Sequence, residues 1–180
     1  MILPQEHIYK SEDYWTLPDG ERAELIDGRL YNMAPPNRIH QKLVQQLSLT
    51  IGNYITTHGG DCEVYPAPFA VNLDSDDKDW VEPDTSVICD KNKLTDRGCS
   101  GAPDFIIEIV SSSSRKMDYS IKNALYSESG VREYWIVDPD KERTTVYYYE
   151  EDAAPTIYTF EQKITVAIYG NLDITVSELL

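Results

Sequence analysis

One carboxylate of this chain lies where a charge is costly. Glu108 stands within Ile106–Val110, a run whose other members are apolar and β-branched. Such a run is typical of a central strand that is buried on both faces of a sheet. A buried carboxylate needs a cationic partner or a bound metal ion, because an isolated charge in a low-dielectric interior is strongly unfavourable. Asp84, in a second strand-like run, and Lys122, on a predicted helix, are the candidates for that partnership.

Two acids and a lysine at one sheet edge suit metal-dependent hydrolysis of a phosphodiester. Neighbouring strands lie about 4.8 Å apart, so Asp84 and Glu108 could share one divalent cation. Mg²⁺, with Mn²⁺ as a substitute, fits such a pair because it prefers oxygen ligands and retains several waters. The metal would polarise the phosphate, and Lys122 would orient the attacking water or stabilise the developing charge. We therefore predict Asp84, Glu108 and Lys122 as catalytic residues, the two acids being the metal ligands.

Each of these residues also has an ordinary structural explanation. Pro-Asp at the start of a strand is a common turn element, which could account for Asp84. Glu108 could be neutralised by a buried salt bridge to Lys122 alone. Lys122 could be a solvated helix lysine, as most lysines are. The three residues taken together favour the site more than any one of them does.

Four further polar residues are secondary candidates. Asp118 lies one helical turn before Lys122, and Tyr126 one turn after it, so both could brace the ammonium group. Arg115 and the adjacent Lys116 follow a serine-rich segment and could contact a phosphate where the strand ends, or they could simply form a basic loop near the start of a helix. Glu24, in a hairpin, could be an additional acid near the metal. His40 is expected to be a surface or core-edge histidine unless a carboxylate faces it.

Hydrophobic periodicity predicts the elements that position these residues. Apolar residues recur at every fourth position over 38–58, which predicts a long amphipathic helix that Gly59-Gly60 ends. Asp27-Gly28 between apolar runs predicts a hairpin with a type I′ turn. The other predicted elements are a short helix from Ser11, a helix over 117–129, strands over 63–73, 80–89, 105–110, 131–137, 144–149, 156–161 and 164–169, and a polar connection over 91–101. This order predicts an α/β (α+β) fold, a mixed sheet flanked by helices, as a single domain over residues 1–180.

Composition narrows the functional classes. The chain has 16 basic and 31 acidic residues, a net charge of −15 that repels a polyanion at long range and argues against avid DNA binding. We expect the acidic clusters 74–77 and 150–152 to be solvated loops. No stretch has the length and apolarity of a membrane span, and no secretory leader is evident, so we expect a cytoplasmic protein without membrane contact. The three cysteines lack close metal-ligand spacing and are predicted to be free thiols.

At this point several motifs resemble those of the Uma2 family, a group of proposed endonucleases also called DUF820. The resemblance runs from about Glu12 to the C-terminus and is carried by these segments, in order: Glu24–Leu30, His40, Glu82-Pro83-Asp84, Pro103–Ser111, Asp118, Lys122, Tyr126 and Gly130–Pro139. The family resembles the PD-(D/E)XK restriction endonucleases, which implies a restriction-endonuclease-like fold and a divalent metal site. Asp84 and Glu108 match the two acids of that motif.

The chain departs from the motif of the superfamily at two positions. Val110 stands two residues after Glu108, where a lysine is expected, and Lys122 matches the lysine that the family is thought to use instead. Ser112 stands where the family usually has proline, a change that touches no proposed ligand.

Three functions remain open from the sequence. The first is a Mg²⁺-dependent endonuclease that hydrolyses DNA phosphodiester bonds. The second is a catalytically silent binding or assembly domain, which the charge of −15 and an expected surface rich in exposed tyrosine would suit. The third is a hydrolase of small phosphoesters. A homodimer is also expected, with the apolar, tyrosine-rich C-terminal strands and residues 176–180 covering a sheet edge or exchanging with a neighbour.

Overall fold

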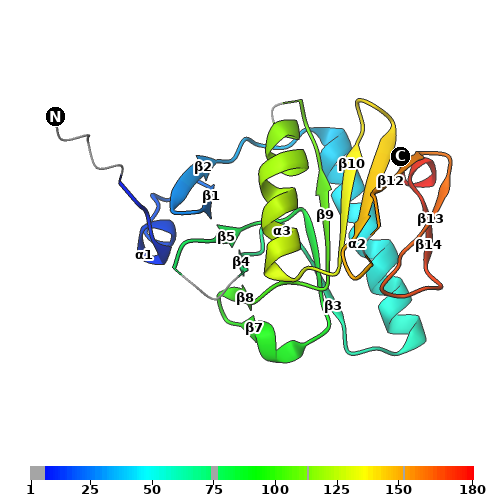
Figure 1. The fold of residues 1–180 in the computed structure, drawn as a ribbon, viewed down its shortest axis with the longest axis horizontal. Helices are drawn as coiled ribbons and strands as arrows, with labels where there is room; N and C mark the ends of the chain where they lie inside the picture. The colour runs from blue at the N-terminus through cyan, green and yellow to red at the C-terminus, as the bar shows by residue number, and fades with distance from the viewer. Residues whose placement is uncertain (1–6, 74–76, 113, 152) are drawn as a thin grey trace.

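The computed structural model describes residues 7–73, 77–112, 114–151 and 153–180. Within them the chain forms two six-stranded sheets, a two-stranded sheet and two principal helices (Figure 1). This is the mixed α+β architecture that the pattern of elements predicts. Residues 74–76 and 152, which the predicted acidic loops include, lie outside the described residues.

The larger sheet carries Glu108 on a central strand. Its order is β12-β11-β10-β9-β6-β3, and its members are β12 (Thr156–Thr159), β11 (Arg143–Tyr148), β10 (Glu133–Asp138), β9 (Phe105–Ile109), β6 (Thr85–Ile88) and β3 (Glu63–Pro66). β9 runs parallel to β10 and antiparallel to β6. The burial of every residue of β9 confirms that this strand is covered on both faces.

Helices cover both faces of this sheet. The long helix α2 (Arg38–His58) has the predicted bounds, and Leu43, Leu47 and Ile51 pack with the odd-numbered residues of β9. On the other face lie the π-helical segment η2 (Met117–Lys122) and the continuing helix α3 (Asn123–Ser129), whose Tyr126 belongs to the same core cluster as Ile106 of β9 and Val110, which follows that strand. The two core clusters therefore correspond to the two faces of one strand.

The second six-stranded sheet, which is made of shorter strands, joins the N-terminal hairpin to the middle of the chain. Its order is β2-β1-β5-β4-β8-β7, made of β1 (Ala23–Ile26), β2 (Arg29–Asn32), β4 (Val71–Asn72), β5 (Trp80–Val81), β7 (Leu94–Thr95) and β8 (Gly98–Ser100). The short helix α1 (Ser11–Trp15) precedes it. Asp27 and Gly28 both have positive φ, 47° and 70°, as the predicted type I′ turn requires.

Two predicted strands are wrong in their continuity, because each passes from one sheet to the other. The segment 63–73 is β3 and then β4, with Ala67-Pro68 between them, and the segment 80–89 is β5 and then β6, with Glu82-Pro83-Asp84 between them. Proline has no N–H to donate to a strand ladder, so each proline marks the point where pairing stops. The predicted polar connection 91–101 is also more regular than expected, since it holds the 3₁₀ turn η1 (Lys91–Lys93), β7 and β8.

The C-terminal segment folds back onto the sheet instead of extending it. The predicted strand 164–169 is correct only at its start: β13 (Lys163–Thr165) is shorter, and it pairs with β14 (Asp173–Thr175) as a separate ribbon instead of completing the sheet. A 3₁₀ turn, η3 (Val176–Leu179), follows, and its Val176 joins the core cluster beneath α2. The last residues thus pack on their own chain.

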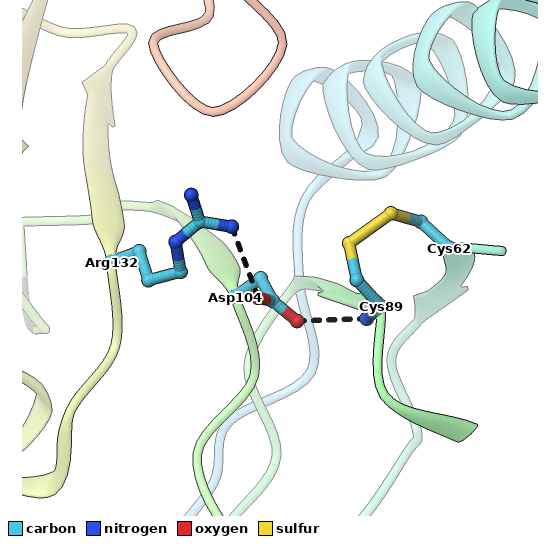
Figure 2. The surroundings of a disulfide bond; sticks show 4 residues. All are labelled: Cys62, Cys89, Asp104 and Arg132. Atoms are coloured by element: carbon cyan, nitrogen blue, oxygen red, sulfur yellow. Dashed lines mark hydrogen bonds and ion pairs between the residues drawn. A yellow bond between two sulfur atoms is a disulfide. The ribbon is translucent and has the colours of Figure 1, made fainter. Parts of the chain in front are cut away.

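A disulfide corrects the prediction of three free thiols. Cys62 precedes β3 and Cys89 follows β6, and the antiparallel register of these strands, with Glu63 opposite Ile88, places the two cysteines side by side. Their sulfurs are bonded (Figure 2). The sequence hides this pairing because 27 residues separate the cysteines. Cys99 is a free thiol, as predicted, and it is buried.

The surface differs from expectation in one respect. None of the 13 tyrosines is exposed: Tyr14, Tyr126 and Tyr134 are buried and the other ten are half-buried. In the part of the chain that the structure describes, no helix is long and apolar enough to cross a membrane.

Candidate active site

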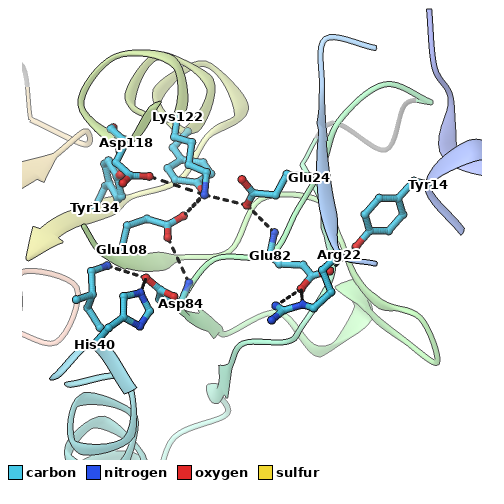
Figure 3. A network of polar contacts seen from close by, with 12 residues as sticks. Tyr14, Arg22, Glu24, His40, Glu82, Asp84, Glu108, Asp118, Lys122 and Tyr134 are labelled. Atoms are coloured by element: carbon cyan, nitrogen blue, oxygen red, sulfur yellow. Dashed lines mark hydrogen bonds and ion pairs between the residues drawn. The ribbon is translucent and has the colours of Figure 1, made fainter. Parts of the chain in front are cut away.

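Glu108 points from the centre of the sheet toward the helix η2. Side chains alternate along a strand, so Glu108 shares its face with Ile106 while Ile107 and Ile109 face α2. On β10 it lies opposite Ile136. Its side chain is only 5% exposed, and it contacts polar groups from three other segments (Figure 3).

Asp84 lies beside Glu108 because of the proline that ends β5. The pairing of Thr85 with Ile107 places Asp84 at the next position, level with Glu108. The amide of Asp84 lies 3.4 Å from Glu108 Oε2, and the amide of Ile109 donates to Asp84 Oδ2 at 2.8 Å. The two predicted acids are therefore adjacent, as expected for strands in register.

His40 also joins the site, because a carboxylate does face it. The first turn of α2 brings His40 Nε2 to 3.0 Å from Asp84 Oδ2. The other ring nitrogen, Nδ1, is buried and has no hydrogen-bond partner. His40 thus connects the long helix to Asp84. The sequence left a role for His40 open on the condition that a carboxylate faces it, and this condition is met.

Lys122 reaches the same point from the other face of the sheet. Its Nζ lies 2.8 Å from Glu108 Oε1 and 2.8 Å from Glu24 Oε1, and the side chain is 5% exposed. It is the last residue of η2, where the helix is wound in the wider π form, a feature often found at functional sites. The lysine is therefore neither solvated nor on the strand.

Glu24 and Asp118 complete the surroundings of the ammonium group. Glu24, on β1, also accepts a hydrogen bond from the amide of Glu82 at 3.0 Å, which ties the N-terminal hairpin to the site. Asp118 Oδ1 lies 3.9 Å from Lys122 Nζ, one turn away as predicted. Both acids are buried.

Tyr126 takes a different position from the one expected. Its hydroxyl donates to Glu108 Oε1 at 2.7 Å and so supports the carboxylate instead of bracing the lysine. Tyr134, which sequence reasoning assigned only to a strand, donates to the carbonyl of Asp118 at 3.2 Å. Both tyrosines belong to the core cluster on the face of the sheet that η2 and α3 cover, and from there they hold Glu108 and the backbone of Asp118 in place.

Arg115 and Glu82 differ from their expected surroundings. Arg115 pairs with Asp138 through Nη2 at 2.8 Å and Nε at 3.1 Å, and no contact joins it to the acids of the site within the described residues. Glu82, two residues before Asp84, appeared in the sequence analysis only within the Glu82-Pro83-Asp84 motif and was given no role, yet it binds Arg22 and Tyr14. Its signal was the same as that of Glu108, a carboxylate beside apolar strand residues.

The electrostatics of the cluster are dominated by excess negative charge. Burial raises the pKa of Glu108 well above its usual range; Lys122 opposes this shift, and the neighbouring acids add to it. Burial likewise raises the pKa of Asp118 to about 6. For Lys122 burial would lower the pKa, but the ion pairs with Glu108 and Glu24 outweigh it and raise the pKa well above its ordinary value. Three carboxylates, those of Glu24, Glu108 and Asp118, thus surround one lysine, and Asp84 lies beside Glu108. Further positive charge at this point would reduce the repulsion among the four acids.

The free oxygens of this cluster fit a hard divalent cation. Glu108 Oε1 is used by Lys122 and Tyr126, whereas Oε2 has only the long contact with the amide of Asp84. Asp84 Oδ1 makes no hydrogen bond or ion pair within the described residues. No cluster of three or more acid, histidine or cysteine ligands occurs among the described residues. Two carboxylates with free oxygens are the kind of ligand set that can hold Mg²⁺, which keeps several waters and needs one or two carboxylates.

Comparison with known proteins places the chain in a family. Residues 11–177 match the profile described as "Uma2: Putative restriction endonuclease". The chain belongs to the Uma2 family. This membership confirms the resemblance inferred from the motifs, and that description of the family is of a putative restriction endonuclease.

This Uma2 protein is similar in sequence to one relative, at modest identity, and similar in fold to a solved structure. An uncharacterized protein, slr1290, of Synechocystis sp. is 23% identical over 161 residues, which cover 89% of this chain and 80% of the relative. A crystal structure of a nuclease described as putative and as belonging to DUF820, from Anabaena variabilis, superposes with a TM-score of 0.77 at 17% identity. That match covers 94% of this chain and 96% of the other, and it confirms the restriction-endonuclease-like fold predicted from the motifs.

Proposed function

We propose that this Uma2 protein is a Mg²⁺-dependent endonuclease that hydrolyses phosphodiester bonds of DNA. The observation that carries the proposal is the convergence of Asp84, Glu108 and Lys122 at one point of the sheet, from the β5–β6 connection, the strand β9 and the helical segment η2. Membership of a family described as restriction endonucleases supports the same class of reaction. The expected metal ligands are Asp84 and Glu108.

The cation would polarise the scissile phosphate and lower the pKa of the attacking water when it is bound. The protein's own residues orient the two carboxylates that would bind the cation. Lys122 and Tyr126 hold Glu108 Oε1, so that Oε2 is directed to the side of Asp84. His40 and the amide of Ile109 hold Asp84 Oδ2. The second oxygen of each acid is left for the metal.

Lys122 supplies the fixed positive charge of the site. A protonated lysine is a donor only, so it can orient water or stabilise charge that develops on phosphate oxygens. Val110 occupies the strand position where the superfamily motif has lysine, and it is buried in the apolar cluster beside Tyr126. The ammonium group therefore approaches Glu108 from η2 instead of from β9.

Substitution of the three residues with near-isosteric side chains tests the proposal. We expect Asp84→Asn, Glu108→Gln and Lys122→Met each to lower Mg²⁺-dependent cleavage of duplex DNA by at least about 100-fold, since each removes a ligand or a charge used in the transition state. Circular dichroism would show whether the fold is kept. Asp173→Asn, at an exposed acid on β14, is the matched control and should cleave like the wild type.

Calorimetry separates this proposal from the alternatives. Binding of Mg²⁺ or Mn²⁺ by the wild type, and its loss in Glu108→Gln, is the expected result. An absence of binding at millimolar metal would favour a catalytically silent assembly domain. Hydrolysis of nucleotides without any cleavage of polymer would instead indicate a hydrolase of small phosphoesters.

A further inference from the structure

A cleft of about 700 Å³ lies between the first turns of α2 and the end of β3. Val44, a core residue, reaches its floor, and the other helix side chains that line it are polar: Arg38, Gln41, Lys42, Gln45 and Gln46. The opposite wall is formed by Pro66 and Ala67. These polar helix residues follow the spacing i, i+3, i+4, i+7 and i+8, so they form one continuous stripe along the helix.

The stripe is separate from the faces of α2 that hold the fold together. Leu43, Leu47 and Ile51 are fully buried in the core. Ser48, on a neighbouring face, contacts the hydroxyl of Thr85 at 3.1 Å, and His40 reaches Asp84. The polar stripe therefore has no evident role in packing.

Charge distinguishes this cleft from the rest of an acidic molecule. Its lining contains two cations and no acid, although the chain has 31 acidic residues. Arg38 and Lys42 form no ion pair or hydrogen bond within the described residues. A second cleft, beside α1, is lined instead by Asp19, Glu21 and Glu82 with a single arginine.

The cleft adjoins the candidate active site. Ala67 donates its amide hydrogen to the carbonyl of Asp84 at 3.0 Å, and Pro66 lies opposite Thr85 in the β3–β6 register. His40, between Arg38 and Gln41 in sequence, contacts the Asp84 carboxylate. A chain of phosphates that passes through the cleft would therefore reach the acids of the site.

We propose that this cleft binds the sugar–phosphate backbone of duplex DNA next to the scissile phosphate. Arginine, lysine and glutamine side chains are suitable donors to phosphate oxygens. Single strands are usually held by bases stacked on aromatic side chains, and none lines this cleft. The inference rests on the proposed nuclease function, and it explains how so acidic a chain can hold a polyanion: contact is confined to one local patch without negative charge.

The double variant Arg38→Gln/Lys42→Gln tests the cleft, with Arg97→Gln/Lys141→Gln as the charge-matched control. Arg97 stacks over Trp15 and Lys141 is exposed, so the control removes the same charge elsewhere. Binding of a short fluorescent duplex is measured by anisotropy in EDTA at several salt concentrations, and cleavage is measured separately with Mg²⁺. Because binding is measured without metal, it does not depend on catalysis.

We expect the cleft variant to raise Kd on the order of tenfold or more and to reduce the slope of log Kd against log salt by about two, one for each lost phosphate contact. Its cleavage should show a higher KM, and the control should match the wild type in both assays. Cleavage with unaltered duplex binding in the cleft variant would overturn the cleft alone. Cleft-dependent binding without any cleavage would overturn the proposed nuclease and retain the cleft. A wild type that binds no duplex but cleaves it would overturn the cleft alone, and a wild type that neither binds nor cleaves duplex would overturn both.

Discussion

Glu108 is stable inside the sheet because its two carboxylate oxygens have different surroundings. Oε1 is held by Lys122 and Tyr126, and Oε2 faces the backbone of Asp84. The salt bridge and the metal site, which are alternatives in the sequence, are therefore compatible in the structure. The partners Asp84 and Lys122 were predictable from residue type and spacing, but Tyr126 was not assigned correctly, since its helical spacing from Lys122 does not show which partner its hydroxyl reaches.

Asp118 allows a pH test of the excess negative charge. Burial raises the pKa of Asp118 from 3.8 to about 6, with Lys122 opposing the shift. Because the folded pKa lies above the unfolded value, protonation stabilises the fold; this contribution is complete below about pH 4 and is lost as the pH rises through 6. Asp118→Asn mimics the protonated acid, so its stability relative to wild type should increase by on the order of 2 kcal/mol between about pH 4 and pH 8.

Urea denaturation of both proteins at the two pH values measures this difference. Asp96→Asn, at an exposed aspartate, serves as the control and should show little dependence on pH. A stability difference between Asp118→Asn and wild type that stays constant over the range would contradict the excess of negative charge at this position.

Among the helices and strands, the sequence predicted correctly those elements that depend on local sequence patterns. The helix over 38–58, the Asp27-Gly28 hairpin and the buried strand β9 follow from periodicity and turn chemistry, and all three are observed. The exchange of strands between sheets at Pro68 and Pro83 was missed, because apolar runs continue across each break and pairing depends on distant partners. This exchange matters for the site, since the break at Pro83 is what places Asp84 level with Glu108.

Glu133 gives a test of how β10 holds the C-terminal segment. Its buried carboxylate accepts hydrogen bonds from Trp135 Nε1 at 2.7 Å and from the amides of Ala167 and Ile168 at 3.1 and 3.0 Å. In Glu133→Gln the amide group must face at least one of these donors. We expect a loss of about 1–3 kcal/mol in the free energy of unfolding, the cost of leaving a buried polar group without a partner.

Chemical denaturation measures this loss, and Glu161→Gln, at an exposed glutamate near the same segment, is the control. Hydrogen exchange should show faster exchange at the amides of Ala167 and Ile168 in the Glu133 variant. A Glu133→Gln protein as stable as the control would show that these bonds contribute nothing net.

For the whole molecule, the distribution of charge matters more than its total. The net charge of −15 predicts repulsion of DNA. Outside the cleft, basic residues such as Arg115, Arg132 and Lys163 are neutralised by ion pairs with acidic residues. Arg38 and Lys42 differ from these in having no acidic partner. Composition alone could not reveal this, because only the folded chain shows which charges neutralise one another.

The Cys62–Cys89 disulfide sets a limit on how far the whole chain can unfold. It closes a loop of 27 residues between the edge strand β3 and β6, and Cys89 is further held by Asp104, which accepts its amide hydrogen at 2.7 Å. A loop of this length is expected to stabilise the fold by about 3 kcal/mol, mainly by restricting the unfolded chain. The double variant Cys62→Ala/Cys89→Ala should therefore be less stable than the oxidised wild type by about that amount in urea. A reducing agent should lower the wild type to the level of the variant and leave the variant unchanged, and three titratable thiols in the unfolded, unreduced wild type would contradict the disulfide.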